Sequence, residues 1–234
     1  MSMAGSIGKL HQRRLREVWR SAGWPCQDMV EVELLAAGLL QRVPDGQGRD
    51  TLRVTDAGVQ LLAATLNQNR AARDAHEALV GRVATEMQRA GRLVWRGLSL
   101  RAPLPGVAED DAPRWVIAMP DVFSIRHTTL EHAVEPIVHE IKVRRADLLS
   151  DLKRPDKGGA YRALASQCWY VIRAGMAEPQ EIPEAFGVLL AHDDRLEVAR
   201  PAPRRPLRPP LTLWMALARA NCERSDDDEA QGRL

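Results

Sequence analysis

The first part of the chain has the apolar spacing of amphipathic helices, followed by a short ribbon. Apolar side chains recur near helical spacing over residues 8–22 and again over about residues 28–40, which predicts two helices. Residues 41–44 and 51–54 then flank a polar turn at 45–50 that contains two glycines. Because glycine adopts the positive φ that a hairpin tip requires, we expect two strands joined at this turn.

A longer helical stretch follows the ribbon. Thr55 is placed to cap a helix that begins near Asp56, since a threonine hydroxyl accepts a hydrogen bond from a free backbone N–H group at the start of a helix. Residues 67–90 are expected to form a connecting helix with an apolar stripe, and Gly91 is expected to end it.

From residue 93 onward the pattern changes to short apolar runs that are typical of strands. We expect strands at residues 93–100, 115–125 and 137–143. A loop of proline, glycine and acidic residues at 101–113 separates the first two. The second is interrupted at Met119-Pro120, which places Asp121 at a bend.

Helices and strands alternate after the third of these strands. The sequence predicts helices at 146–153, where Pro155 breaks the pattern, and at 160–167. A strand at 169–172 and a hairpin over 187–198 are expected to finish the sheet. The fold class expected from this order is α/β.

The C-terminal segment has a different composition. Residues 201–210 are rich in proline and arginine, which predicts an extended linker. Residues 211–220 form a short amphipathic pattern that we expect to dock on the core. The tail from Asn221 carries Asp226-Asp227-Asp228-Glu229 and is expected to be disordered.

The strand at 137–143 carries charges inside an apolar run. Side chains alternate faces along a strand, so Glu140 and Lys142 point the same way while Ile141 and Val143 point the other way. A carboxylate and an ammonium in such a run are costly unless they are paired or bind a metal. A solvated pair on an edge strand is the alternative.

Asp121 adds a second carboxylate beside this strand. Two carboxylates and one lysine around a small volume suit divalent-metal phosphodiester chemistry. Carboxylate oxygens hold Mg²⁺ or Mn²⁺, and the amine of Lys142 orients or deprotonates an attacking water.

These residues carry a resemblance to a known family. Pro120-Asp121, a spacer of eighteen residues (122–139) and then Glu140-Ile141-Lys142 resemble the signature of the PD-(D/E)XK nuclease superfamily. The continuation from Lys142 to Asp151 resembles the MmcB-related DNA repair nuclease group within it. The resemblance covers residues 73–198 and implies a restriction-endonuclease-like mixed β-sheet core flanked by helices.

The resemblance also implies roles for particular residues. Asp121 and Glu140 would hold Mg²⁺ or Mn²⁺ together with the backbone carbonyl of Ile141. Many superfamily members supply a third acidic residue from the helix before the first strand, and Glu77 is the candidate, with Glu86 as runner-up. Gln167 matches a glutamine that supports the site in several branches; a helix-capping amide is the alternative.

The first 66 residues are similar to a winged helix-turn-helix domain. That similarity implies DNA contact by a helix and by Arg49 or Arg53 in the wing. Winged helices also serve as protein-protein or dimer modules, so both interpretations stay open. Glu31 and Glu33, on the helix expected to enter a groove, would repel phosphate.

A local basic cluster surrounds the proposed metal site. Six cations occur within nineteen residues, 144–162. They are Arg144, Arg145, Lys153, Arg154, Lys157 and Arg162. We expect them to neutralise the phosphates flanking the scissile one. The alternative is a solvated basic face whose charges are balanced by Asp147, Asp151 and Asp156.

Composition says more about the cellular location of the protein than about the reaction it catalyses. The 234 residues carry a net charge of only +2, so a nucleic-acid surface must be local. Cys26, Cys168 and Cys222 are far apart and form no C-x-x-C spacing, which favours a reducing cytoplasm over a disulfide framework. No run has transmembrane length and no signal peptide is evident, so we expect a cytoplasmic protein without membrane contact.

The sequence therefore predicts three parts: a winged-helix domain (1–66), a nuclease-like domain (67–200) and a C-terminal segment (201–234). The expected function is Mg²⁺- or Mn²⁺-dependent hydrolysis of DNA phosphodiesters, in DNA repair or in defence against foreign DNA. The alternatives are a non-enzymatic winged-helix DNA-binding regulator with a nuclease-like dimerisation domain, and an RNA-processing nuclease. A homodimer is left open.

Overall fold

The computed structural model describes residues 7–44, 46–106 and 112–223. Three predictions fall partly or wholly elsewhere: Asp45 of the polar turn, residues 107–111 of the loop at 101–113, and the acidic run at 226–229 lie outside the described residues. The chain divides into two compact units between Ala71 and Ala72. This boundary falls within α3 (Asp56–Arg89), which contributes residues to both units.

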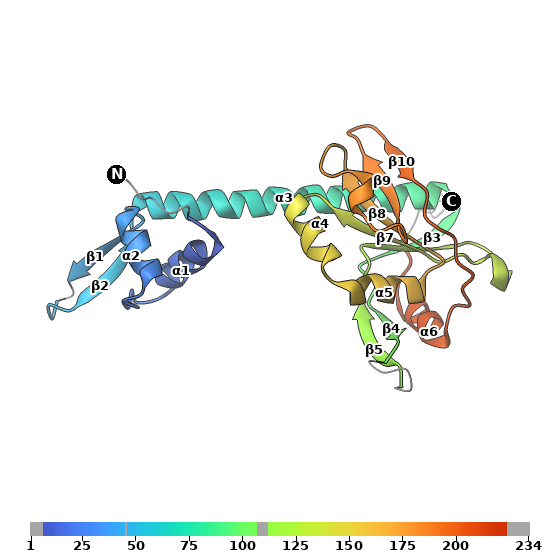
Figure 1. Ribbon diagram of the computed structural model, residues 1–234, viewed down its shortest axis with the longest axis horizontal. Coiled ribbons are helices and arrows are strands. Elements are labelled where there is room, and N and C mark those ends of the chain that lie inside the picture. The colour runs from blue at the N-terminus through green and yellow to red at the C-terminus, as the bar shows by residue number, and fades with distance from the viewer. Residues whose placement is uncertain (1–6, 45, 107–111, 224–234) are drawn as a thin grey trace, which may run out of the picture. The chain divides into compact units, whose positions relative to one another are not determined.

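The smaller unit contains two helices, a hairpin and the first part of α3 (Figure 1). The elements are α1 (Lys9–Arg20), α2 (Met29–Ala36), β1 (Leu40–Pro44) and β2 (Asp50–Val54), with β1 and β2 antiparallel. These elements confirm the predicted helices and ribbon. The predicted cap is confirmed too, because the Thr55 hydroxyl accepts a hydrogen bond from the Gly58 N–H at 3.2 Å.

Leucine and valine side chains from these elements form the core of the smaller unit. The buried members are Leu15, Val18, Leu34, Leu39, Leu40, Leu52, Val54 and Leu62. Glu31 is also buried, and its carboxylate accepts hydrogen bonds from the N–H groups of Cys26 (2.6 Å) and Gln27 (2.9 Å). The expectation that Glu31 repels phosphate is therefore wrong, because its carboxylate is buried and bound by the loop before α2.

The larger unit is built on a six-stranded mixed sheet with the order β10-β9-β8-β7-β6-β3. The strands are β3 (Arg92–Arg96), β6 (Val122–Arg126), β7 (Ile137–Lys142), β8 (Gln167–Arg173), β9 (Gly187–Ala191) and β10 (Leu196–Arg200). β7, β8 and β9 are parallel, and the other pairs are antiparallel. The α/β class is confirmed, and so is the hairpin that finishes the sheet.

Helices cover both faces of this sheet (Figure 1). The later part of α3 packs on one face, through a cluster that includes Leu79, Val83, Val94 and Ile141. The other face packs against α4 (Arg145–Leu152), α5 (Pro155–Leu164) and α6 (Leu211–Arg219). Short 3₁₀ helices occupy Glu131–Ala133 and Pro179–Glu181.

A second hairpin packs on α5 and corrects one prediction. The expected single strand at 93–100 is wrong, because β3 ends at Arg96 and β4 (Leu100–Leu104) belongs to another sheet. Gly97, at φ +59°, turns the chain between them, a conformation that favours glycine. β4 pairs with β5 (Arg114–Ala118), so the predicted loop at 101–113 is partly a strand.

The helix predicted at 160–167 is displaced toward the N-terminus. α5 starts at Pro155, which occupies the first turn, where its missing N–H is not needed. The helix ends at Leu164, and Gln167 is the first residue of β8 instead of the last residue of a helix. The proline that was expected to end one helix therefore starts the next.

The C-terminal segment lies along the larger unit. Residues 201–210 have no regular secondary structure, and the Arg205 N–H donates to the carbonyl of Ser166 at 2.9 Å. Leu213 and Leu217 of α6 are buried in the core, which confirms that this helix docks. Among the residues that the structure describes, no helix is both long and apolar enough to cross a membrane.

Candidate functional site

The predicted site lies at the C-terminal end of β7. β7 is an interior strand between β6 and β8, so the interpretation of Glu140 and Lys142 as a solvated edge pair is wrong. The Glu140 side chain is only 4% exposed and the Lys142 side chain 12%. Their burial means that each charge must find a partner within the fold.

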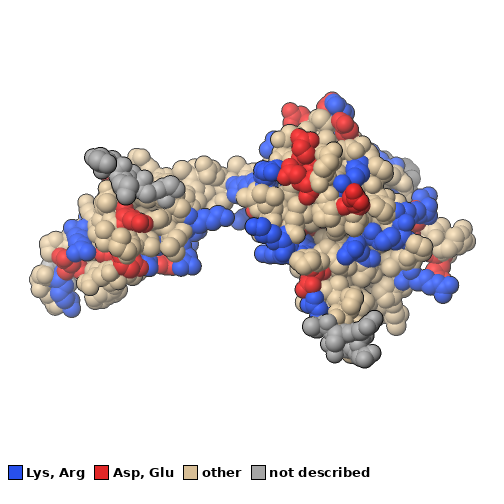
Figure 2. Space-filling model, in the orientation of Figure 1, with Lys and Arg blue, Asp and Glu red and all other residues tan. Residues whose placement is uncertain are grey.

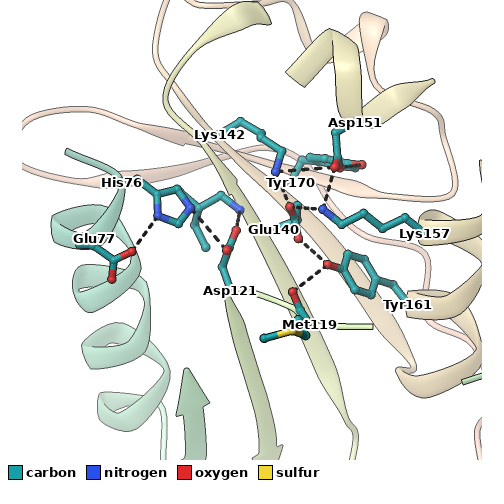
Figure 3. A network of polar contacts seen from close by, with 11 residues as sticks. His76, Glu77, Met119, Asp121, Glu140, Lys142, Asp151, Lys157, Tyr161 and Tyr170 are labelled. Carbon is teal, nitrogen blue, oxygen red and sulfur yellow. Dashed lines mark hydrogen bonds and ion pairs between the residues drawn. The ribbon is translucent and has the colours of Figure 1, made fainter. Parts of the chain in front are cut away.

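Glu140 binds three donors (Figure 3). One oxygen, Oε1, contacts the ammonium of Lys142 and lies 2.5 Å from the ammonium of Lys157. The other, Oε2, accepts a hydrogen bond of 2.6 Å from the Tyr161 hydroxyl. These donors come from β7 itself and from α5, so the fold holds this carboxylate from two elements.

Asp151 is a further carboxylate of the same network, so the alternative of a solvated face does not hold for this residue. It is buried on α4, 2.6 Å from the Lys157 ammonium, and accepts a hydrogen bond of 2.8 Å from Tyr170. The Lys142 ammonium lies 3.8 Å away. One signal for its burial was present, because Asp151 lies three residues after the buried Leu148 on the same helix face.

Asp121 approaches from the bend before β6. Its Oδ2 accepts a hydrogen bond of 2.7 Å from the backbone N–H of Ile141, and its Oδ1 lies 3.4 Å from Nε2 of His76 on α3. Burial raises the pKa of Asp121, and the negative charge of Glu140 raises it further. The structure thus brings Asp121, Glu140 and Lys142 together.

Electrostatics distinguish the roles of the polar groups. Burial alone would lower the pKa of Lys157, but the carboxylates of Glu140 and Asp151 raise it, so this amine stays charged. Burial followed by the nearby carboxylates raises the pKa of both Tyr161 and Tyr170, so both remain hydroxyl donors. Three carboxylates face two ammoniums here, which leaves an excess of negative charge when all are ionised.

That excess is the feature that fits a divalent cation. Asp121 and Glu140 supply the hard oxygen atoms that Mg²⁺ and Mn²⁺ prefer. A cation between them would offset the repulsion that raises the pKa of Asp121. Within the described ranges, no group of three or more His, Cys, Asp or Glu side chains is arranged as a metal site.

Other predicted site residues lie away from this network. Gln167 pairs in register with Ile137, three residues before Glu140, and its side chain accepts a hydrogen bond of 3.3 Å from Trp169. Glu77 is 64% exposed and contacts His76 at 3.2 Å, so it reaches Asp121 only through that histidine.

The runner-up acidic residue also has a local role. Glu86 forms an exposed ion pair of 3.0 Å with Arg89, three residues later on α3. His76 was missed in the sequence, although it lies three residues before the buried Leu79 on that helix. The helical spacing therefore marked His76 as facing the sheet.

The six predicted cations divide into bound and unbound groups. Lys157 belongs to the buried network, and both terminal nitrogens of Arg145 are paired with Glu181, at 2.9 and 2.6 Å. The Arg162 side chain lies 3.4 Å from the carbonyl of Gly158. Lys153 and Arg154 are exposed and form no ion pair with any residue that the structure describes.

The remaining cation, Arg144, is half-buried and engaged in an interaction of its own. Figure 2 shows Lys and Arg side chains gathered over the part of the larger unit that carries α4 and α5. In the smaller unit, Arg49 and Arg53 are exposed, and Arg53 lies on β2.

Comparisons with known proteins add little. No protein-family model matches the chain, and no curated protein matches it. One solved structure is similar, the SPO1766 protein of unknown function from Silicibacter pomeroyi. It is 20% identical over 65% of this chain and 83% of its own, with a TM-score of 0.39.

Proposed function

We propose that this protein is a metal-dependent nuclease that hydrolyses DNA phosphodiester bonds. The observation that carries the proposal is the meeting of Asp121, Glu140 and Lys142 at the end of one interior strand. It agrees with the resemblance to the PD-(D/E)XK superfamily, and with a restriction-endonuclease-like fold for the larger unit. DNA repair and defence against foreign DNA are the roles that this activity suits.

In this proposal Asp121 and Glu140 hold Mg²⁺ or Mn²⁺, with the Ile141 carbonyl as the resemblance implies. The bound ion would supply Lewis-acid polarisation of the phosphoryl oxygen and lower the pKa of a bound water. Lys142 orients that water toward the phosphorus atom. Lys157 offsets the charge of Glu140 and fixes its direction, since its own ammonium is bound on both sides by carboxylates.

The smaller unit is proposed to be a winged helix that contacts DNA. Arg49 and Arg53 are exposed near and on the β1–β2 hairpin, where their side chains would bind backbone phosphates. This contact is independent of the chemistry and adds affinity that falls as salt rises. Replacing both arginines should weaken binding to all sequences alike.

A non-catalytic DNA-binding protein is the second candidate, and one observation favours it. Both oxygens of Glu140 already have donors within the fold: Lys142 and Lys157 at one, and Tyr161 at the other. A buried ion-pair network of this kind also serves purely structural ends. Metal binding would have to shift at least one of these contacts.

The experiment compares the wild type with Asp121→Ala and Lys142→Ala on end-labelled DNA, with Mg²⁺, with Mn²⁺ and with EDTA. We expect each substitution to slow cutting by about 10²–10⁴-fold, the range of a lost acid–base or positioning group. Glu86→Ala is the matched control, because it removes a carboxylate of α3 that is 43% exposed and pairs with Arg89.

Undiminished cutting by Asp121→Ala or Lys142→Ala would reject the assignment of the site. A wild-type protein that binds DNA but leaves it intact with either metal would favour the non-catalytic candidate. A parallel digest of RNA separates the third possibility, an RNA-processing nuclease.

A further inference from the structure

A groove lies directly beside the candidate site, between β5 and the start of α5. It has a volume of about 580 Å³, within the range of ligand sites in proteins. Residues 116–119 form one wall, and residues 154–157 with Ala160 form the other. Lys157 belongs both to this wall and to the network around Glu140, so the groove adjoins the site.

The β5 wall is apolar and open to solvent. Ile117 is 74% exposed and Met119 57%. Trp115, on the same strand, is 48% exposed and lies under the guanidinium of Arg101, 5.5 Å from the ring centre. Within the described residues, β5 pairs with β4 alone. Such surfaces in soluble proteins mark binding sites.

The opposite wall, formed by residues 154–157 and Ala160, is positively charged. Arg154 lines the groove and Lys153 precedes it, and neither forms an ion pair within the described part of the chain. The acidic residue of this wall is Asp156. Its carboxylate lies 2.5 Å from the guanidinium of Arg114 on β5, which offsets its charge. An occupant should therefore be anionic along one side and flat and apolar along the other.

We propose that this groove takes unpaired nucleotides of the substrate strand. Their bases would lie on Ile117 and Met119, while their phosphates meet Arg154 and Lys153. A duplex keeps its bases stacked inside and offers mainly phosphates and groove edges, so it would leave the apolar wall unused. An unpaired strand exposes its apolar base faces, which would pack against such a wall.

This inference rests on the proposed function and narrows its substrate to single-stranded or locally unpaired DNA. The next phosphodiester along the strand would then lie close to Lys157, which lines the groove and also contacts Glu140 of the candidate site. Base contacts of this kind tolerate any sequence, because every base has an aromatic face.

The test measures binding in EDTA, so that no cutting interferes. Fluorescence anisotropy compares a labelled oligo(dT) with a duplex of equal length for the wild type, Ile117→Ser, Arg154→Gln and Val198→Ser. Val198 is the matched control, since it is an apolar side chain 57% exposed on the edge strand β10.

We expect Ile117→Ser to weaken oligo(dT) binding roughly tenfold, in line with the loss of a largely buried aliphatic contact, and to leave duplex binding unchanged. Arg154→Gln should weaken oligo(dT) binding and reduce its salt dependence by about one phosphate contact. Val198→Ser should change neither affinity.

Unchanged oligo(dT) affinity in Ile117→Ser overturns the inference. So does a shift of Ile117→Ser from dimer to monomer in sedimentation with no change in DNA binding, because a second copy of the chain would then cover β5. If the wild type cuts DNA and Ile117→Ser binds DNA as tightly as the wild type, the groove proposal is rejected and the proposed nuclease activity stands. Groove-dependent binding of oligo(dT) without any cutting supports the groove and rejects the nuclease.

Discussion

The two carboxylates of the candidate site have very different surroundings. Glu140 is 4% exposed and receives two ammoniums and one hydroxyl. Asp121 is 20% exposed and receives one backbone N–H, with the ring of His76 at 3.4 Å. Burial and the charge of Glu140 raise the pKa of Asp121. One carboxylate is fully bound by the chain, and the other is not.

The difference separates structural from chemical roles within one site. Glu140 joins β7 to α5 and, through Lys157, to Asp151 on α4, so the fold depends on its charge. Burial and the charge of Glu140 raise the pKa of Asp121 by more than the Ile141 N–H, His76 and Lys142 lower it, so a cation would have more to offset there. Substitutions at Glu140 should therefore cost stability as well as activity, whereas substitutions at Asp121 should cost activity without a loss of stability.

The largest expected effect is on folding, from Glu140→Gln. The substitution leaves the ammoniums of Lys142 and Lys157 without their shared carboxylate in a buried site. Removing one partner of a buried ion pair typically costs about 3–5 kcal/mol of unfolding free energy. Urea unfolding at pH 7 measures it, with Asp121→Asn as the control. Equal losses in the two variants would erase the distinction drawn between these carboxylates.

The next effect tests the hydroxyl donors of the network. Tyr161→Phe removes the donor to Glu140, and Tyr170→Phe removes the donor to Asp151. Each should lower the unfolding free energy by about 1.5–3 kcal/mol, the usual value of a hydrogen bond to a charged group. A double-mutant cycle of Tyr161→Phe with Glu140→Gln should show strong coupling. Additive losses would mean that the bond contributes nothing beyond packing.

Local patterns were enough to place the three residues of the signature. The interruption at Met119-Pro120 put Asp121 at a bend, and the β-branched run around Glu140 predicted an interior strand. Both depend on features within a few residues of the site. The side-chain period of two then placed Glu140 and Lys142 on the same face.

The partners of these residues depended on long-range packing that periodicity cannot supply. Asp151 and Tyr170 meet across 19 positions of sequence, and Lys157 reaches Glu140 across 17. Helical spacing marks Asp151 as inward-facing but does not say what it meets. Gln167 was misplaced because Pro155 started a helix that was expected to begin later, which moved the whole helix toward the N-terminus.

A smaller effect should appear in the pH dependence of stability. The folded pKa of Asp121 lies above its unfolded value near 3.8, so its favourable contribution is present below that pH and is lost as pH rises through the folded pKa. Asp121→Asn stays neutral throughout. We expect the variant to match the wild type at low pH and to melt a few degrees higher at pH 7, about 2–4 °C for each kcal/mol gained.

Melting curves from pH 3 to pH 8 measure this difference. A difference in melting temperature between wild type and Asp121→Asn that stays constant from pH 3 to pH 8 would show that the fold does not raise the pKa of Asp121. Added Mg²⁺ should then raise the melting temperature of the wild type more than that of Asp121→Asn, because the carboxylate that would hold the ion is missing from the variant.

The smallest effect is expected at Glu77, which is 64% exposed and contacts the ring of His76 at 3.2 Å. Glu77→Gln should change the unfolding free energy by no more than about 0.5 kcal/mol, as surface substitutions usually do. Its cutting rate should match that of Glu86→Gln, an exposed carboxylate two to three turns further along α3. A loss as large as that of Asp121→Asn would instead make Glu77 the third acidic residue that the resemblance implies. The acidic part of the site would then extend through His76 to Glu77 on α3. Asp121 would share with Glu77 the negative charge that a cation offsets.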